Sequence, residues 1–482
     1  MNRNTDVIVI GAGISGLSAA YWLKQQGHSV QILEKADRVG GSIQTTQEDG
    51  LIIEHGPNSG METNPVIGKL VESLGLVDEM IYANDEANNR YIVREQELHP
   101  LPMSPLKFFG TKLFSRKAKW RVPMELFIGK AQEDKEETVA EFVSRRLGQE
   151  FLDYAINPFV AGVFAGDPKE LSVKAAFPKL EALEANYGGI FKGVIKGRRE
   201  RKKRAAEGEE SKQSAQMFSF RNGLGTLTES LGEALSDSIQ TGVEVEEVKP
   251  EDNHWKVTYS KDGVSHKVSA DSVLFAVPAY VASEFIRGLD NETAAALDAI
   301  PYAKAIMMYS AFDKKDVPID LDGFGYLIPE KEKMNILGTI WSTTVFENRA
   351  PDGKVSFTTF VGGRRQPEKL ELSDDELIQE MREDFALLMG IEAQPEKLFI
   401  RRWPKAIPQY TLGHLDREAR IKTFEENHSG LFITGNHRGG ISVADCIKHS
   451  EPRAEKIGEY LKNKKNSTAE TQRTQRIEEK IN

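Results

Sequence analysis

Cysteine is almost absent from this chain: Cys446 is the only one, so no disulfide can form within it. The sequence also has no run of about eighteen apolar residues, and we therefore expect no helix that crosses a membrane. No charged leader with an apolar segment precedes the first expected strand, so we expect no signal or transit peptide. These absences predict a cytoplasmic location, with any membrane contact being peripheral.

An excess of positive charge is absent as well. The net charge of -10 argues against general nucleic-acid binding, and we interpret the short basic run at residues 196–204 as a helix end and a solvated loop. The chain of 482 residues is too long for one simple core and is long enough for two or three domains. A hydrophobic share of 39% and a charged share of 28% are typical of a soluble globular protein.

Residues 6–16 form the strongest motif of the sequence, Asp-Val-Ile-Val-Ile-Gly-Ala-Gly-Ile-Ser-Gly. Its apolar β-branched run predicts a buried parallel strand, and the helical spacing of the apolar residues that follow predicts a helix. In such a unit Gly11 makes the turn, Gly13 lets backbone approach a pyrophosphate, and Gly16 lets helix and strand pack closely. The N-terminus of the helix would face the phosphates with unpaired N–H groups.

A second group of residues strengthens this interpretation. Glu34 ends the next expected strand, about twenty residues after the glycines, where a carboxylate takes the ribose hydroxyls of an adenosine. Residues 38–42, Arg-Val-Gly-Gly-Ser, follow directly. Their two glycines let backbone approach another part of the ligand, and Arg38 can reach a phosphate. A site for a nicotinamide cofactor alone does not require this second loop.

Residues 103–130 mix aromatic and aliphatic side chains with basic ones. A basic segment with interleaved aromatic residues can lie in a membrane interface. The same pattern can form two ordinary helices of a helical subdomain, so both interpretations stay open at this point.

The C-terminal half has three further parts. Residues 289–403 suggest a mixed or antiparallel sheet that covers a pocket over the cofactor. Residues 431–435 are expected to form one more buried strand, which leads into a last helix. The polar tail at 463–482 is predicted to be disordered.

Six segments closely resemble the oxygen-dependent protoporphyrinogen oxidase family, particularly its plant-like members, within the FAD-dependent amine-oxidase-like superfamily. The resemblance runs from about residue 5 to residue 462 and includes segments outside the glycine motifs. The segments are NPFVAGVFAGDP (157–168), FSFRNGLGTL (218–227), LGTIWSTTVFENRAP (337–351), FTTFVGG (357–363), AIPQYTLGHL (406–415) and GNHRGGISVA (435–444).

The resemblance implies an α/β protein, α+β overall, with three parts: a Rossmann-type FAD-binding domain, a mixed-sheet substrate domain and a helical membrane-contacting domain. The FAD domain would comprise residues 1–88, 214–288 and 404–462. The substrate-binding sheet domain would comprise residues 89–94 and 289–403, and the helical domain residues 95–213. This placement favours the interfacial interpretation of the basic aromatic segment.

The resemblance also implies an activity, the oxidation of protoporphyrinogen IX to protoporphyrin IX in haem biosynthesis. Loss of hydride from a methylene bridge leaves a cation that the pyrrole nitrogens delocalise, and non-covalent FAD carries the difficult step. Six electrons leave in three flavin cycles, each of which would reduce oxygen to peroxide. No side-chain base is obviously required, so no catalytic residue is assigned, and no metal ligand either.

By motif matching, the substrate-binding residues are Arg90, Leu327, Ile340, Phe360, Phe159 and Gly162. Arg90 corresponds to an arginine that pairs with a propionate of the substrate. Leu327 and Ile340 correspond to aliphatic residues on either side of the macrocycle, and Phe360 to an aromatic residue that stacks on a pyrrole. The family usually has leucine where this chain has Ile340. Without the resemblance, a surface arginine and core apolar residues would be expected.

The predicted cofactor site is larger than the two glycine loops. Val245 is the expected contact on the adenine side, and the helix beginning near Ser442 would point its N-terminus at the pyrimidine edge of the flavin, where reduction accumulates negative charge. The full set is Gly11, Gly13, Ile14, Ser15, Gly16, Glu34, Lys35, Arg38, Gly40, Gly41, Ser42, Gly56, Pro57, Asn58, Val245, Trp403, Gly435, Asn436, Ile441, Ser442 and Val443.

Three alternative functions stay open. The first is oxidation of coproporphyrinogen III to coproporphyrin III, with the same fold and cofactor on a substrate with more carboxylates. The second is amine oxidation; some amine oxidases carry FAD on a cysteine, but Cys446 falls inside the last helix. The third is a non-catalytic flavoprotein. Expected partners are a porphyrinogen, molecular oxygen and a membrane surface, and candidate partners are a second copy of the chain and a downstream ferrochelatase.

Overall fold

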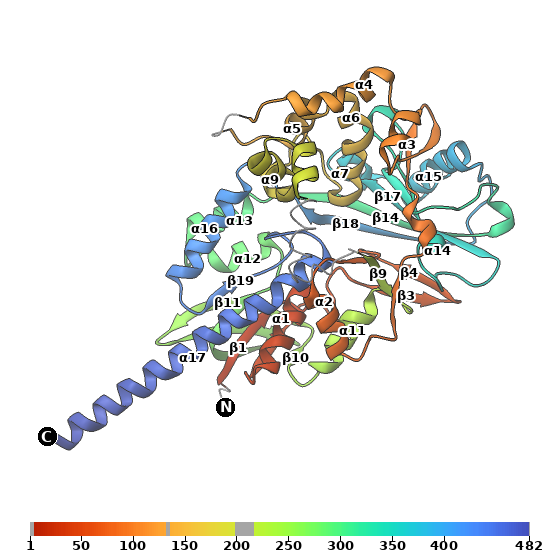
Figure 1. Cartoon of the computed structure of the whole chain (residues 1–482). Helices are drawn as coiled ribbons and strands as arrows, with labels where there is room; N and C mark the ends of the chain where they lie inside the picture. The colour runs from red at the N-terminus through yellow and green to blue at the C-terminus, as the bar shows by residue number, and fades with distance from the viewer. Residues whose placement is uncertain (1–3, 132–134, 198–215, 482) are drawn as a thin grey trace.

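The computed structural model describes residues 4–131, 135–197 and 216–481. Two seven-stranded sheets form the centre of the molecule, and a group of short helices lies at the far end of the second sheet (Figure 1). The basic run that we interpreted as a solvated loop lies largely outside the described residues.

The first sheet has the order β10-β2-β1-β13-β12-β11, with β19 paired to β13. Its strands β10, β2, β1, β13 and β19 run parallel, whereas β11, β12 and β13 form an antiparallel ribbon. The fold class predicted from the sequence is therefore confirmed, because this is a Rossmann-type sheet beside a second, mixed sheet. The strand bounds are β1 Asn4–Ile10, β2 Val30–Leu33, β10 Ile239–Gln240, β11 Val243–Glu251, β12 His254–Lys261, β13 Val264–Phe275 and β19 Leu431–Ile433.

Strand β1 is apolar at consecutive positions because helices cover both faces of the first sheet. Val7 and Val9 belong to the core under α1 and α17, and Ile8 and Ile10 belong to the core on the opposite face. The covering helices are α1 Ile14–Gln25, α2 Pro65–Ser73, α11 Gly225–Ala234 and α17 Val443–Ile481 on one face, and α12 Ala279–Ile286, α13 Asn291–Asp298 and α16 His414–Asn427 on the other.

The second sheet has the order β18-β14-β17-β16-β15-β7-β8 and is antiparallel except where β15 pairs with β7. One face is buried under α15 (Asp374–Met389), whose Leu377, Met381 and Phe385 belong to that core. The strand bounds are β7 Tyr91–Arg94, β8 Glu97–Pro100, β14 Tyr302–Asp313, β15 Gly325–Leu327, β16 Gly338–Trp341, β17 Lys354–Gly362 and β18 Lys397–Pro408.

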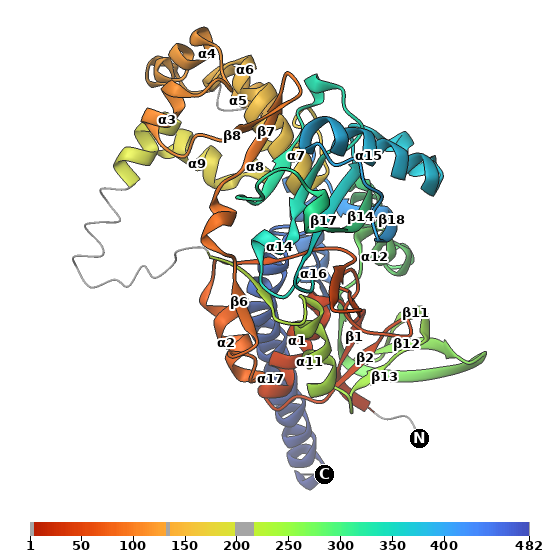
Figure 2. The same cartoon turned by 90° about the vertical axis from the view of Figure 1, so that its right-hand side faces the viewer.

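The remaining elements connect or flank the two sheets. Figure 2 shows the short helices α3 to α9 grouped at one end of the molecule and α17 running along the first sheet toward the other end. The bounds are β3 Thr45–Glu48, β4 Leu51–Glu54, β5 Gly60–Glu62, β6 Met80–Tyr82, β9 Gln216–Phe220, α3 Pro105–Gly110, α4 Arg116–Arg121, α5 Val139–Arg146, α6 Gln149–Phe151, α7 Asn157–Phe164, α8 Val173–Ala176, α9 Pro178–Tyr187 and α14 Ser342–Val345.

A buried ion-pair network holds the helical group together. Arg146 is fully buried, and its guanidinium lies 2.9 Å from a carboxylate oxygen of Glu125 and 2.8 Å from one of Glu184. Because an unpaired buried charge is costly, the three side chains fix α5 against α9 and the turn at Pro123–Phe127.

The structure corrects three sequence-based boundaries. Residues 97–100, placed in the helical domain, form β8 and complete the second sheet. The second sheet also continues to Pro408 in β18, past the predicted boundary at residue 403. The prediction of a disordered tail at 463–482 is wrong, because α17 continues to Ile481. Extending a helix that is already packed needs no new nucleation, and this tail is rich in helix-forming residues.

Candidate functional site

Three glycines shape the turn between β1 and α1. A Cβ atom on Gly11 would lie 2.6 Å from the carbonyl oxygen of Ala276, and one on Gly16 would lie 2.1 Å from that of Gly11. Packing therefore excludes a side chain at both positions. A Cβ atom on Gly13, in contrast, would have no neighbour within 4 Å. The turn thus leaves free space beside Gly13, where the sequence predicts a pyrophosphate.

The second glycine loop lies directly against the first. The amide of Gly40 donates to the carbonyl of Ala12 at 2.8 Å, and a Cβ atom on Gly41 would lie 3.2 Å from the Cα of Gly13. Gly56 continues this surface, because its Cβ atom would lie 2.3 Å from the carbonyl oxygen of Ser42. The predicted cofactor residues at 13, 40–42 and 56 therefore lie next to one another, with the backbone of Gly41 and Ser42 exposed.

Glu34 and the start of β11 lie together at one end of this group of residues. The Glu34 carboxylate accepts the amide of Ala12 at 2.6 Å and that of Ala36 at 2.8 Å, which leaves further lone pairs for ribose hydroxyls. The amide of Val243 donates to the carbonyl of Glu34 at 2.9 Å, so β11 and Val245 start beside it. Lys35, also predicted as a cofactor contact, instead pairs with Glu244 at the surface, at 2.7 Å.

The loop before α17 is held by hydrogen bonds at both ends. Tyr410 Oη donates to the carbonyl of Asn436 at 2.8 Å and accepts the amide of Gly440 at 3.0 Å. Ser442 Oγ accepts the amide of Asp445 at 3.1 Å and donates to its carboxylate at 2.6 Å, which is a reciprocal helix cap. The position of the α17 N-terminus, from Gly435 through Ile441 to Val443, is therefore fixed without any ligand.

Trp403 joins the second sheet to the segment that follows β4, a strand of the separate two-stranded β3–β4 sheet. Its indole Nε1 donates to the carbonyl of His55 at 2.9 Å, directly before Gly56 and Pro57. Strand β4 also packs on the second sheet, since Leu51 and Ile53 share a core with Met307 and Tyr309. The predicted cofactor residues Gly56, Pro57 and Trp403 thus lie where the β3–β4 hairpin meets the second sheet.

The face of the second sheet opposite α15 carries the predicted apolar substrate contacts. Residues directly opposite each other in a ladder share a face, and so do residues two apart in one strand. Leu327 lies opposite Gly338, and Gly338 opposite Phe360, so Leu327 and Phe360 share one face with a glycine between them. Ile340 lies on this face, opposite Gly325. Two glycines therefore leave the middle of an apolar face flat.

Arg90 lies at the edge of this face, immediately before β7. Its guanidinium carbon lies 5.5 Å from the ring centroid of Phe324, and Phe324 packs in one cluster with Ile340. Within the described ranges 4–131, 135–197 and 216–481, no carboxylate lies within ion-pair distance of Arg90. The structure thus brings an unpaired cation close to the apolar residues.

Helix α7 covers the other side of Leu327. A Cβ atom on Gly162 would lie 2.8 Å from a methyl carbon of Leu327, so glycine is needed for this approach. Phe159 lies one helical turn earlier, is 40% exposed and has its ring 6.0 Å from that of Phe177. All six predicted substrate residues therefore belong to one region, with Phe360 toward β4 and Phe159 toward the helical group.

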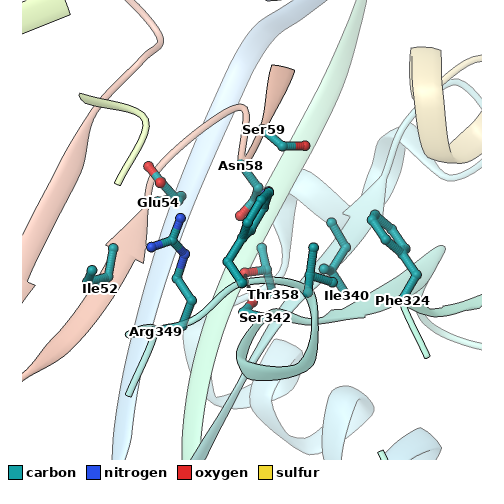
Figure 3. Close-up of a pocket in the computed structure, with 11 residues that line it drawn as sticks. Ile52, Glu54, Asn58, Ser59, Phe324, Ile340, Ser342, Arg349 and Thr358 are labelled. Carbon is teal, nitrogen blue, oxygen red and sulfur yellow. Dashed lines mark hydrogen bonds between the residues drawn. The ribbon is translucent and has the colours of Figure 1, made fainter. Parts of the chain in front are cut away.

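Sequence reasoning missed two buried charged residues beneath Ile340. Glu54 and Arg349 line a cavity of about 20 Å³, room for one or two water molecules, and Figure 3 shows them facing each other. Burial raises the pKa of the Glu54 carboxyl to about 7, although Thr45 Oγ1 and the amide of Leu224 donate to it at 2.6 and 2.7 Å. One feature of the sequence could have indicated this site: Glu54 is a carboxylate that ends an apolar strand just before a glycine.

The helical group has a surface of exposed apolar side chains. Leu106 and Phe127 are 89% and 87% exposed, and Trp120 is 71% exposed. Lys112, Arg116 and Lys117 are exposed among them, whereas Lys119 donates to the carbonyls of Phe109 and Thr111. No helix in the described part of the chain is both long enough and apolar enough to span a membrane.

Comparisons with known proteins extend over nearly the whole chain. A model of the flavin-containing amine oxidoreductase family matches residues 14–457. Protoporphyrinogen oxidase 2, chloroplastic/mitochondrial, from Arabidopsis thaliana is 34% identical over 479 residues, which cover 94% of either chain. Coproporphyrinogen III oxidase from Bacillus subtilis is 28% identical over 94% of this chain and 98% of that one.

Two solved structures share the fold. A candidate protoporphyrinogen oxidase from an Exiguobacterium species has a TM-score of 0.79 at 23% identity, over 95% of this chain and 99% of that chain. Cyclohexylamine oxidase from Brevibacterium oxydans has a TM-score of 0.68 at 18% identity, over 95% and 100% of the two chains. Both likenesses extend over both sheets and the helical group.

Proposed function

The chain belongs to the flavin-containing amine oxidoreductases and, within them, to the protoporphyrinogen oxidase family, and from this premise we propose that it oxidises protoporphyrinogen IX to protoporphyrin IX. It is an oxidoreductase with FAD as its cofactor. The free space at Gly13 and the backbone surface that continues through Gly41 to Gly56 fit such a dinucleotide.

One observation carries the choice of substrate: the flat apolar face of the second sheet ends at an unpaired arginine. A porphyrinogen is a broad, largely apolar macrocycle with carboxylate groups on one part of its rim. Leu327, Ile340 and Phe360 are half-buried and offer apolar contact, while Gly325 and Gly338 keep the centre flat. The guanidinium of Arg90 would pair with a propionate at the rim.

In this proposal the protein binds and orients the substrate and supplies no catalytic side chain. FAD supplies the hydride acceptor and the route of the electrons to oxygen. The apolar face would exclude water from the reacting methylene bridge, and Arg90 would set which bridge lies nearest the cofactor.

We propose that FAD is bound non-covalently. Burial raises the pKa of the only thiol, Cys446, to about 11, so the nucleophilic thiolate is scarce at neutral pH. Cys446 also lies within α17, one residue after Asp445 of the helix cap. Denaturation should therefore release all of the flavin into the supernatant, and yellow colour retained on the precipitated chain would contradict this.

Oxidation of coproporphyrinogen III is the second candidate, because the relative with that name covers the same length at lower identity. The test is an aerobic assay of the purified protein with each porphyrinogen, following porphyrin fluorescence and peroxide. We expect the higher kcat/KM with protoporphyrinogen IX. A higher value with coproporphyrinogen III would replace the proposal with the second candidate, and turnover of neither would leave a flavoprotein of another function.

We also propose that the exposed apolar side chains of α3, α4 and the following turn rest on a membrane surface. Leu106, Trp120 and Phe127 would enter the interface while Arg116 and Lys117 would meet anionic head groups. A cytoplasmic location stays a prediction from the features that the sequence lacks, and a second copy of the chain and a downstream ferrochelatase stay candidate partners.

A further inference from the structure

Arg401 has a buried donor without a partner. It lies on β18 between Phe399 and Trp403, and all three side chains share the face that packs against β4. Its guanidinium carbon lies 4.7 Å from the ring centroid of Trp403. Its Nε atom is buried and has no hydrogen-bond partner among the described residues.

A second unpartnered nitrogen lies next to it. The ring of His55 packs on Phe399 with a centroid distance of 4.5 Å, and the carbonyl of His55 accepts the indole of Trp403. The Nδ1 atom of this ring is buried without a partner, while Nε2 is within 2.8 Å of Thr46 Oγ1. Phe399 and Trp403 thus position His55 and Arg401 on the same side of β18.

Arg38 adds a second guanidinium to this place. It donates to the carbonyls of Val39 and Gly41 at 2.9 and 3.0 Å, and so lies over the second glycine loop. Burial lowers the pKa values of Arg38 and His55, and the charge of Arg401 lowers both further, so Arg401 lies within electrostatic range of both groups. In the described part of the chain, no carboxylate is within ion-pair distance of either arginine.

Two guanidiniums and an imidazole, with two unsatisfied buried nitrogens, form an arrangement that an oxyanion would stabilise. Unpaired buried donors are costly, and charge-assisted hydrogen bonds to an anion are among the strongest that a protein makes. The glycine loop under Arg38 touches Gly13, beside which the backbone leaves free space. We infer that Arg401 is a ligand of the FAD diphosphate, provided by the second sheet, and that with Arg38 it binds this group from both sides.

This inference rests on FAD being the cofactor and not on the identity of the substrate. A substrate carboxylate has the same oxyanion chemistry, so the experiment must separate the two sources. It uses apoprotein and free flavins, with no porphyrinogen in the binding assay. Riboflavin serves as the matched ligand because it has the same ring system without phosphate.

The variants are Arg401→Gln, Arg401→Lys and the control Arg402→Gln. Arg402 is the next residue of β18, on the opposite face, where it pairs with Asp374 and donates to the carbonyl of Leu372 at 2.6 Å. We expect R401Q to weaken FAD binding about 10- to 150-fold, the loss of one charge-assisted hydrogen bond. Riboflavin affinity should not change, R401K should recover part of the loss, and R402Q should bind both ligands like the parent.

Three results would overturn the inference. Unchanged FAD affinity in R401Q with a raised KM for porphyrinogen would assign Arg401 to a substrate carboxylate. An equal loss of riboflavin and FAD affinity would make Arg401 a structural residue of the flavin pocket. An equal effect of R402Q would mean that the strand itself had been disturbed. None of these results depends on whether the protein prefers protoporphyrinogen.

Discussion

Arg90 tests the substrate assignment at the scale of a single residue. Its guanidinium has only the ring of Phe324 as a described partner, so its removal should disturb the fold little. A charge-assisted hydrogen bond contributes roughly 1.5–3 kcal/mol. Arg90→Ala should therefore lower kcat/KM for the porphyrinogen roughly 10- to 150-fold, and Arg90→Lys should recover only part, because an ammonium lacks the planar fork.

The control for Arg90 is a porphyrinogen with esterified propionates. If Arg90 binds the carboxylate, R90A and the parent should turn over the ester almost equally. An equal deficit on the ester and on the acid would make Arg90 structural and the substrate placement wrong.

Gly13 tests the cofactor position. A Cβ atom there meets no protein atom within 4 Å, so Gly13→Val should fold normally while its side chain fills the space predicted for the pyrophosphate. We expect the purified variant to contain no FAD. Gly288→Val is the matched control, since Gly288 is exposed and also has nothing within 4 Å of its Cβ position. Full flavin loading of G13V, measured by absorbance, would refute the placement.

Glu54 should make stability depend on pH. Burial raises the pKa of this carboxyl from 4.5 to about 7, so the folded chain binds more protons than the unfolded chain between these values. The free energy of unfolding should therefore fall as the pH rises from 4.5 to 7, by up to about 3 kcal/mol from this one group. Glu54→Gln removes the titration. Parallel urea-denaturation profiles of E54Q and the parent across this pH range would contradict the assignment.

The helical group allows a test at the scale of an element. Lys112, Arg116 and Lys117 are exposed beside α3 and α4, and each charge near an anionic surface is worth about 1 kcal/mol. Changing all three to glutamine should weaken binding to anionic vesicles by roughly 100-fold at low salt, without loss of FAD. Lys119 is left unchanged because it donates to the carbonyl of Phe109.

The matched control for the vesicle experiment neutralises three exposed lysines of the first sheet and its helices: Lys267, Lys422 and Lys462. The net charge changes by the same amount in the two triple variants, so they differ only in where the neutralised charges lie. If both triple variants lose the same affinity, the attraction is a general charge effect, and the α3–α4 region is an ordinary helical subdomain.

Elements with a clear residue signal could be predicted, and elements without one could not. The β1–α1 turn follows from glycines that the local backbone requires, as at Gly16. Strand β8 was missed because Glu95 and Gln96, which form the tight turn between β7 and β8, adopt positive φ values without being the Gly, Asn or Asp residues that mark such hairpins. The cavity at Glu54 was missed because Arg349 is anchored far from it in the sequence, by Ser219 Oγ, 130 residues earlier, at 2.8 Å.

The candidate site depended on both kinds of inference. Glycine spacing alone predicted the two loops that meet at Gly13 and Gly41. Arg90, Leu327 and Phe360 became site residues only through the family resemblance, because an arginine and two apolar residues on short strands are otherwise ordinary. The structure brings the predicted residues into one region, but it turns Lys35 toward Glu244 at the surface. The sequence pattern does not determine the direction in which a surface side chain such as Lys35 points.

At the scale of the whole molecule, FAD should stabilise the fold by binding beside the contact of the β3–β4 hairpin with the second sheet. This contact includes the hydrogen bond from Trp403 to His55 and the packing of β4 on β14. A ligand that binds only the folded chain adds about 2.7 kcal/mol at one hundred times its Kd. The Tm of the apoprotein should therefore rise with FAD concentration, measured by circular dichroism. A Tm independent of FAD concentration would mean that the folded chain does not bind FAD.

The first sheet also has a consequence for how the protein is made. Strand β13 lies between β1, at residues 4–10, and β19, at residues 431–433, so these three strands come from distant parts of the chain. A ribosome adds roughly 5–20 residues per second, so β13 waits on the order of 10 to 30 s before β19 exists. During that interval residues 273–275 of β13, which later pair with β19, form an unpaired hydrophobic strand edge, which is prone to wrong pairing. The nascent chain should therefore depend on chaperones until synthesis is almost complete.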